Sequence, residues 1–258
     1  MIDPVIARLL ENYFDKIFVV TIERATDRHA QVKQQLEGLS FDFFFGTDKQ
    51  TMDWEKIKIG NTVYDEVRTK KNNRVGKAMN AGEVACALSH RGLYQHIVEK
   101  GYRRVLVFED DVVPLIENLS MLPVIIKELP ENWDLVYFGY TKHEKVTSAL
   151  KRKQFFYRLV SPLGLIKWTP AMVKNMLPLP YTEHLKKSGY HDCTHAYAIT
   201  AQTAGLLLPK QTPVVFNADS LLSDVILKGE IKAFVIEPQL FIQENHLDPL
   251  HPSIIHQL

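Results

Sequence analysis

Residues 104–111 read RVLVFEDD, an apolar, β-branched run that ends in three acidic residues. Such a run is typical of a strand that is buried on both faces of a parallel sheet. Similar runs stand at residues 16–22 (KIFVVTI) and 134–139 (DLVYFG), and segments with helical apolar spacing separate the three. The order strand, helix, strand, helix, strand predicts an open parallel sheet of the α/β class.

Two helices are predicted from apolar side chains three or four positions apart. One covers residues 82–100, and Gly101 is placed to end it in a left-handed conformation. The other begins with Asp27 as its cap and continues to about residue 38, with Val32 and Leu36 on its buried side. Further elements are expected as strands over residues 41–45, 196–200 and 231–236, helices over 121–129, 204–208 and 219–228, and a polar insertion loop over 47–80.

The composition is that of an ordinary globular protein of 258 residues, of which 46% are hydrophobic and 24% are charged. A chain of this length suits one domain with one large core. Its 31 basic residues balance 30 acidic ones. This balance argues against a dedicated nucleic-acid binder, because phosphate neutralisation needs a basic excess.

The sequence also bears on the compartment. Two cysteines, Cys86 and Cys193, are too few for a disulfide framework and are interpreted as buried thiols of a reducing compartment. Residues 1–20 lack the basic start and apolar run of a signal peptide. No segment approaches the ~18 uncharged apolar residues of a membrane span. We therefore expect a cytoplasmic protein.

The acidic cluster consists of Glu109, Asp110 and Asp111, directly after the central strand. In an open α/β sheet, ligands bind at the carboxyl ends of the strands, where this cluster lies. Adjacent carboxylates repel one another, so a cation or several hydrogen-bond donors should lie among them. If the chain stays extended, Glu109 and Asp111 point the same way and offer two hard oxygen ligands to Mg²⁺ or Mn²⁺. A solvated acidic turn is the alternative, and the cluster alone leaves both open.

Other catalytic and nucleotide-binding signatures are absent from the sequence. It has no G-x-x-x-x-G-K-[ST] phosphate loop, no G-x-G-x-x-G fingerprint and no G-x-S-x-G nucleophile turn. His191, His195 and His246 lack the paired spacing of a structural zinc site.

Two blocks, GEVACALSH at residues 82–90 and EDDV at 109–112, resemble the G-E-x-x-C-x-x-S-H and E-D-D motifs of glycosyltransferase family 25. This family contains bacterial lipopolysaccharide sugar transferases and the collagen galactosyltransferases. Glu23 departs from the family, which usually has an apolar residue there. Weaker blocks follow in the family's order: VTIERATDR at residues 20–28, FFFGTD at 43–48, AYAIT at 196–200, FNAD at 216–219 and EPQL at 237–240.

The resemblance implies the GT-A type of α/β fold, with a Rossmann-like mixed, mostly parallel sheet flanked by helices. It implies a single domain over residues 1–258, with a nucleotide-sugar-binding half up to about residue 140 and an acceptor-side half after it. The implied ligands are a UDP-sugar donor, a saccharide or glycolipid acceptor, and Mn²⁺ or Mg²⁺. The metal would stabilise the departing nucleoside diphosphate as a Lewis acid.

The same resemblance assigns the metal ligands. Glu109 and Asp111 match the outer positions of a D-x-D-like motif, and Asp110 would hold the ribose or sugar of the donor. Related folds often take a third ligand from a histidine near the C-terminus, for which His246 is the best placed residue. The alternative for His246 is a surface histidine.

Donor-binding residues are expected at the end of the first strand, where the uridine or diphosphate would be held. Thr21, Arg24 and Arg28 lie there, and arginine fits phosphate in a bidentate manner. The alternative is a surface charge pair of the arginines with Asp27 and Glu23.

More donor-binding residues are expected on the helix over residues 82–100. Glu83, Cys86 and His90 share one face of it, and Ser89 is adjacent to His90 but points elsewhere. We expect Glu83, Ser89 and His90 to contact the donor. The alternatives are that Glu83 serves the helix N-terminus and that Cys86 packs as a small apolar residue.

An inverting transfer needs a base that takes the proton of the acceptor hydroxyl as the oxygen attacks the anomeric carbon. Asp219 matches the family's aspartate before a late helix and is the expected catalytic base. An aspartate at a helix start is also a standard N-cap, and both interpretations stay open.

The resulting hypothesis is a cytoplasmic glycosyltransferase that moves galactose or glucose from UDP to a saccharide of lipopolysaccharide or another surface glycan. The lack of a signal peptide disfavours the collagen-modifying branch. A nucleotidyltransferase could use the same acidic strand end but would show a glycine-rich phosphate loop. A catalytically inactive GT-A-like domain that binds a glycan or protein partner is the second alternative, and the intact acidic cluster argues against it.

Residues 141–160 carry six basic side chains and one acidic side chain. Such a charge run is usually a solvated face. The alternative is peripheral contact with an anionic glycolipid or the inner surface of a membrane.

Overall fold

The computed structural model of the protein describes residues 1–72, 76–143 and 145–244. Its strands are β1 Lys16–Thr21, β2 Asp42–Phe45, β3 Arg104–Glu109, β4 Val112–Pro114, β5 Leu135–Thr141, β6 Leu179–Pro180, β7 Leu185–Lys187, β8 Asp192–Thr200, β9 Ala233–Ile236 and β10 Phe241–Gln243. Its helices are α1 Pro4–Tyr13, α2 Thr26–Gln35, α3 Trp54–Lys58, α4 Glu66–Asn72, α5 Ala81–Lys100, α6 Ile116–Leu119, α7 Leu122–Glu128, α8 Ser148–Val160, α9 Pro170–Lys174, α10 Ala201–Lys210 and α11 Ala218–Lys228, with short 3₁₀ turns η1 Ile59–Asn61 and η2 Ser161–Leu163.

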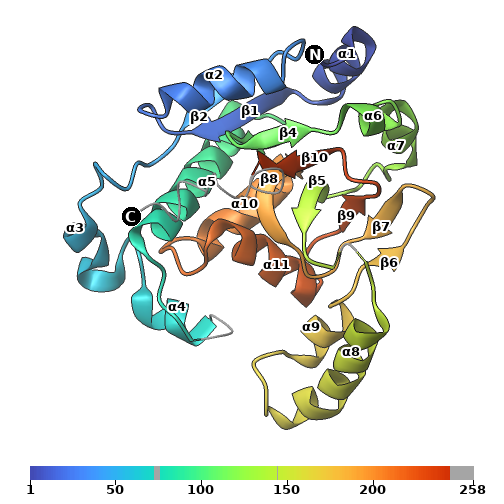
Figure 1. Ribbon diagram of the computed structural model, residues 1–258. Coiled ribbons are helices and arrows are strands. Elements are labelled where there is room, and N and C mark those ends of the chain that lie inside the picture. The colour runs from blue at the N-terminus through green and yellow to red at the C-terminus, as the bar shows by residue number, and fades with distance from the viewer. Residues whose placement is uncertain (73–75, 144, 245–258) are drawn as a thin grey trace.

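A mixed sheet forms the centre of the molecule, with the strand order β2-β1-β3-β8-β5-β9-β7-β6 (Figure 1). From the pairings, β8 and β7 run opposite to the other strands of this sheet. The expected mixed, mostly parallel sheet flanked by helices is therefore confirmed. The simpler expectation of an uninterrupted parallel sheet is wrong, because β8 returns from late in the chain and separates β3 from β5.

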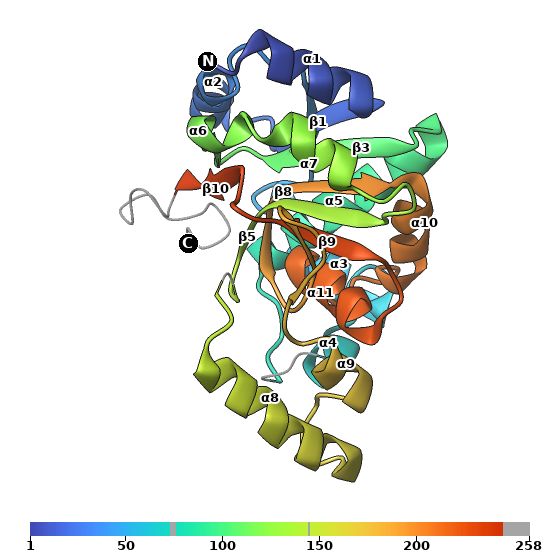
Figure 2. The same ribbon diagram turned by 90° about the vertical axis from the view of Figure 1, so that its right-hand side faces the viewer.

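Helices cover both faces of the sheet, and alternate residues of β3 show how. Leu106 and Phe108 pack in the cluster beneath α1, α2 and α7. Val105 and Val107 point the other way, into the cluster beneath α5, α10 and α11. This alternation is the period of two that a strand imposes on its side chains. Figure 2 shows the two helical layers above and below the sheet.

The helix expected before the central strand is confirmed as α5. Its N-terminus is closed by a capping box, in which the Asn80 side chain accepts from the Glu83 N–H and the Glu83 carboxylate accepts from the Asn80 N–H. Gly101 ends it with φ of 68°, the left-handed conformation that glycine adopts without strain. The capping box fixes Glu83 at the helix end.

Two local expectations are wrong. Asp27 does not cap α2, because the cap is Ala25 without a side-chain hydrogen bond, and Asp27 lies in the first turn, where its charge still favours the helix dipole. The segment over residues 47–80 is not one loop, since it contains α3, η1 and α4.

The carboxyl ends of β1 and β3 lie side by side, with Val20 in register with Glu109. Asp110 and Asp111 form a turn after β3, and β4 then pairs with β10. Because β5 runs in the same direction as β3, it ends at the same edge of the sheet, and the chain continues from there into α8. No helix within the described ranges is long and apolar enough to cross a membrane.

Candidate active site

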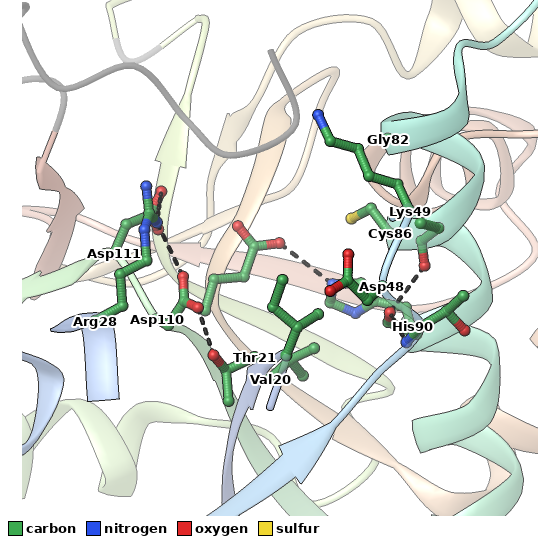
Figure 3. A pocket seen from close by; sticks show the side chains of 15 residues that line it. Val20, Thr21, Arg28, Asp48, Lys49, Gly82, Cys86, His90, Asp110 and Asp111 are labelled. Carbon is green, nitrogen blue, oxygen red and sulfur yellow. Dashed lines mark hydrogen bonds and ion pairs between the residues drawn. The ribbon is translucent and has the colours of Figure 1, made fainter. Parts of the chain in front are cut away.

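A pocket opens at this edge of the sheet, between the end of β1, the end of β3 and the first half of α5 (Figure 3). The lining residues are Val20, Thr21, Ile22, Arg28, Thr47, Asp48, Lys49, Gly82, Ala85, Cys86, Ser89, His90, Glu109, Asp110 and Asp111. Figure 3 shows Thr21, Arg28, Asp110 and Asp111 on one side, with Lys49, Cys86 and His90 on the other. Of the residues predicted from sequence, the pocket therefore gathers Thr21, Arg28, Ser89, His90, Glu109, Asp110 and Asp111.

Asp110 is held by two donors from the first βα unit. The Thr21 hydroxyl donates to its Oδ2 at 2.5 Å, and Arg28 Nη1 donates to its Oδ1 at 3.0 Å. His29 lies against the same group, with Nε2 3.2 Å from Thr21 Oγ1. Both oxygens of Asp110 are therefore engaged, and its present role is to fix α2 to the turn after β3.

Asp111 is buried and incompletely paired. Its Oδ2 accepts from Gln243 Nε2 at 3.3 Å and lies 4.0 Å from Arg28 Nη1. Its Oδ1 is buried and has no hydrogen-bond partner among the residues described. Burial, and then the charges of Glu109 and Asp110, raise the pKa of Asp111 to about 7. A buried carboxylate oxygen of this kind, next to two further carboxylates, fits a divalent cation.

Glu109, at the end of β3, faces the opposite side of the site. Its Oε1 accepts from Thr194 Oγ1 at 2.5 Å and lies 3.2 Å from His90 Nε2. Burial alone would raise its pKa, but the hydrogen bonds of His90 and Thr194, with the charges of His90 and His195, together lower it. The expectation that Glu109 and Asp111 share one side assumed an extended chain, whereas the strand ends at Glu109 and a turn follows.

Cys86, His90 and Glu109 place one potential ligand atom each within 4.8 Å of one another. Burial, and then the charge of Glu109, raise the pKa of the Cys86 thiol well above its usual range. A metal ligand must be a thiolate, so this group is a weaker fit for a cation than the hard oxygens of the acidic turn. His90 is also engaged through Nδ1, 2.8 Å from the Tyr197 hydroxyl.

Ser89 holds the loop that forms one wall of the pocket. Its hydroxyl donates to Ala85 O at 2.8 Å and accepts from the Thr47 N–H at 2.9 Å. Gly46 allows this approach, because a Cβ there would lie 2.2 Å from Ser89 Oγ. Ser89 therefore acts on the pocket through the position of residues 46–49.

Arg24 and Glu83 lie outside the lining of this pocket. Arg24 donates through Nε to Asp48 Oδ2 at 2.5 Å, so its partner is neither of the predicted acids, Asp27 and Glu23. Burial would raise the pKa of Asp48, but the hydrogen bonds from Arg24 and the Gln50 N–H, with the charges of Arg24 and Lys49, together lower it. Glu83 closes the end of α5, as its alternative interpretation proposed.

Asp219 lies in the first turn of α11 and is half-buried beside the site. Its Oδ2 accepts from the Cys193 N–H at 3.5 Å, and its Oδ1 has no partner within the described part of the chain. Burial and then the charge of Asp192 raise the pKa of Asp219 to about 6. The N-cap of α11 is Asn217, so the capping interpretation of Asp219 is wrong.

His246 lies outside the described residues. Glu244, the last described residue, donates its N–H to Asp111 O at 2.9 Å.

Three site residues, Thr194, Gln243 and Lys49, were not predicted from the sequence. Of these, only Lys49 had a usable signal, because it follows Asp48, the last residue of the FFFGTD block.

A family model described as "Glycosyltransferase family 25 (LPS biosynthesis protein)" matches residues 14–222. The chain belongs to glycosyltransferase family 25. The match extends from the start of β1 into α11 and so includes every described residue of the acidic turn and of the pocket wall.

Curated relatives carry family 25 names. A rat protein named "Probable inactive glycosyltransferase 25 family member 3" is 31% identical over 134 residues, which cover 49% of this chain and 23% of that protein. An Anopheles gambiae "Glycosyltransferase 25 family member" is 25% identical, covering 76% and 28%. Mouse "Procollagen galactosyltransferase 2" is 23% identical, covering 90% and 35%. The chain thus spans about a quarter to a third of the length of these relatives.

Solved structures show weaker likeness. Mouse xyloside xylosyltransferase 1 in its apo form has a TM-score of 0.37 at 11% sequence identity, covering 89% of this chain and 64% of that chain. A197 from STIV has a TM-score of 0.27 at 13% identity, covering 58% and 62%.

Proposed function

We propose that this family 25 chain transfers galactose or glucose from a UDP-sugar to a saccharide acceptor of lipopolysaccharide or another surface glycan, with inversion. The observation that carries the proposal is the buried Oδ1 of Asp111, which has no hydrogen-bond partner in the described part of the chain and lies beside two more carboxylates in a pocket at the strand ends. A buried carboxylate oxygen without a donor, in a cluster of acidic residues at this edge of an α/β sheet, is a reason to expect a cation and the phosphates that it binds.

The metal in this proposal is Mn²⁺ or Mg²⁺, held by Asp111 and Glu109. When bound, it would supply Lewis-acid stabilisation of the leaving diphosphate. His246 is the proposed third ligand. In the sequence it follows Glu244 by two residues, and the Glu244 N–H donates to Asp111 O at 2.9 Å.

The donor is bound, in this proposal, along the pocket from the end of β1 to α5. Arg28 already shares its guanidinium between Asp110 and Asp111 and can turn a second N–H toward a phosphate. Thr21 keeps Asp110 in place, and Ser89 keeps the loop of Asp48 and Lys49 in place. These residues exclude water and orient the donor rather than taking part in bond breaking.

Asp219 is the proposed base. Its pKa of about 6 lies near neutral pH, where a carboxylate is ionised yet still basic enough to accept the proton of a sugar hydroxyl. A second cavity, lined in part by Asn217, Ser220 and Tyr190, borders the same turn of α11 and is the proposed place for the acceptor. Eight of its twelve described lining residues belong to the half of the chain after residue 140 that we assign to the acceptor, and Thr69, Asn72, Met79 and Glu83 come from the first half.

We also propose that the protein works in the cytoplasm. Cys86 and Cys193 are both free thiols in the structure, as expected in a reducing compartment.

The test is release of UDP from UDP-galactose or UDP-glucose in the presence of Mn²⁺ and a saccharide acceptor. Asp111→Asn is expected to reduce turnover at least about a hundredfold, because it removes a charged ligand without changing shape. Asp42→Asn is the matched control, since Asp42 is a carboxylate on β2 paired with Lys16 away from the pocket. Unchanged turnover in Asp111→Asn would refute the metal assignment.

The alternative function is a catalytically inactive domain that binds a glycan or protein. The relatives whose names include "inactive" favour it. It predicts no UDP release with any metal and no increase in melting temperature with UDP and Mn²⁺, whereas the proposed enzyme shows both.

A further inference from the structure

Helix α8 exposes apolar side chains that the fold does not cover. None of its residues is buried, and it projects from the sheet with contacts mainly to α9 and η2 (Figure 2). Phe155, Phe156 and Leu159 are 64%, 58% and 58% exposed. Leu163 and Leu165, just beyond the helix, are each 70% exposed. We call these five residues the α8 face.

The helical residues of this face form one stripe. Phe155, Phe156 and Leu159 stand at i, i+1 and i+4, which places them within an arc of about 100° on the helix. Exposed apolar area of this size is unfavourable in water unless another surface covers it.

Cations border the stripe. Lys151 is four residues before Phe155 and Arg158 is three after it, so both neighbour Phe155 on the helix surface. No carboxylate among the described residues forms an ion pair with Lys145, Lys151, Arg152, Lys153 or Arg158. These charges are therefore available to an anionic surface.

A groove beside α8 combines the same two chemistries. Lys145, Lys151 and Arg158 line it together with Phe155 and Leu179, the latter 56% exposed on β6. Among the described residues that line it, the one acidic residue, Glu237, is paired with Lys186. A cationic rim over apolar side chains suits a molecule with an anionic head and an apolar tail.

We propose that the α8 face docks on the surface of a bilayer that contains anionic phospholipids. An apolar stripe flanked by Lys and Arg is the pattern of helices that lie in the membrane interface, with the rings among the lipid chains and the cations at the phosphates. A protein partner would need acidic groups of its own to match these cations, whereas an anionic bilayer supplies both the charge and the apolar layer.

Helix α8 follows a strand that ends at the same edge of the sheet as the candidate active site. The chain reaches α8 from the carboxyl end of β5, at the sheet edge where β1 and β3 end beside the pocket. A bilayer held by α8 would therefore lie against a segment that leaves the same edge of the sheet as the one at which the pocket opens. Under the proposed function, this favours an acceptor that is anchored in lipid, but the docking itself does not depend on catalysis.

Vesicle flotation of the full chain tests the proposal. The protein is expected to float with vesicles of phosphatidylcholine mixed with phosphatidylglycerol, to stay behind with phosphatidylcholine alone, and to be released by salt. Phe155→Ser with Leu159→Ser should weaken the interaction about tenfold or more, and so should Lys151→Glu with Arg158→Glu. Unchanged far-ultraviolet circular dichroism and melting temperature establish that these variants fold.

Two matched controls are available. Ile59→Ser with Val67→Ser removes apolar residues that are 70% and 71% exposed on another part of the surface. Lys100→Glu with Lys127→Glu reverses exposed charges at the ends of α5 and α7. Both controls should float like the wild type, and equal losses in them would overturn the assignment to α8.

Three other results would also overturn the proposal. They are failure of the wild type to float with anionic vesicles, equal flotation with neutral vesicles, and a dimer that the Phe155→Ser, Leu159→Ser variant loses while no vesicle binding occurs. In the last case the α8 face is the contact surface between two copies of the chain. UDP release onto a soluble acceptor should be unchanged in the α8 variants, which separates this test from that of the proposed function.

Discussion

Arg28 and Asp110 form an ion pair of 3.0 Å although they are 82 positions apart in the chain. The pair joins the first turns of α2 to the turn after β3, and it brings the guanidinium to 4.0 Å from Asp111. The cation thereby offsets part of the repulsion among the carboxylates and lowers the pKa of Asp111 against the effect of burial. Arg28 is thus a structural part of the acidic turn as well as a proposed phosphate ligand.

Arg28→Ala is expected to weaken binding of UDP with Mn²⁺ by about tenfold or more, because a charge-assisted hydrogen bond contributes ~1.5–3 kcal/mol. Arg28→Lys should lose less, since it keeps the charge and loses only the planar fork. Titration calorimetry measures both. Arg103→Ala, at a side chain that is 88% exposed, is the control and should bind like the wild type. If Arg28→Ala binds UDP with Mn²⁺ as tightly as the wild type does, Arg28 is not a ligand of the donor.

Mn²⁺ affinity is expected to rise with pH up to about 7 and to level off above it. A carboxylate binds a metal only after losing its proton, and burial with the charges of Glu109 and Asp110 raises the pKa of Asp111 to about 7. Below pH 7, each pH unit should change the affinity for Mn²⁺ by up to about tenfold. Asp110→Asn removes one of the repelling charges, so the curve should move to lower pH. Calorimetry in buffers of different ionisation enthalpy measures the proton release, and a flat profile between about pH 5 and 8 would contradict the assignment.

Gly46→Ala is expected to destabilise the protein by ~1–3 kcal/mol and to weaken UDP binding. Its Cβ would lie 2.2 Å from Ser89 Oγ and 2.4 Å from Ser89 Cβ, so the loop that carries Asp48 and Lys49 must move. Gly92→Ala on α5 is the matched control, because its Cβ would meet the Phe44 ring at an ordinary 3.5 Å. That variant should be as stable as the wild type or gain up to ~1 kcal/mol from helix propensity. Chemical denaturation measures the stability of both variants. If Gly46→Ala is as stable as Gly92→Ala, the loop over residues 46–49 can move to accept a Cβ at position 46.

These contacts indicate which parts of the molecule could be predicted from sequence. Helix α5 was predictable because its apolar spacing and Gly101 are local signals. The place of β8 was not, since its register with β3 and β5 depends on pairing between distant segments that no local pattern encodes. The capping error at Asp27 has a local origin, because the helix already begins after Ala25 and Asp27 lies inside its first turn.

In the site, residue types were predictable and pairings were not. The acidic turn after β3 was recognisable from its composition and from its place at a strand end. The choice of Asp48 as the partner of Arg24, and of Thr194 as the donor to Glu109, depends on how loops from different parts of the chain meet. The resemblance to family 25 located the motif but assigned no hydrogen bonds.

Asp219→Asn is expected to reduce turnover by ~10²–10⁴-fold while stabilising the fold above neutral pH. Burial and the charge of Asp192 raise the pKa of Asp219 from 3.8 to about 6 in the folded protein. Between about pH 4 and 6 the folded state therefore holds a proton that the unfolded chain has released, so stability falls as pH rises through this window. Asparagine carries no charge and escapes this penalty.

The stability gain of Asp219→Asn should be on the order of 1–3 kcal/mol at about pH 8 and should vanish below about pH 4. Denaturation at the two pH values measures the difference, and Asp42→Asn on the surface serves as the control. A residue that lowers stability at the working pH and whose replacement abolishes turnover has a functional reason to be charged. If turnover survives in Asp219→Asn while the stability gain appears, the aspartate is only a buried charge, and the base must be sought among other groups near the acceptor cavity.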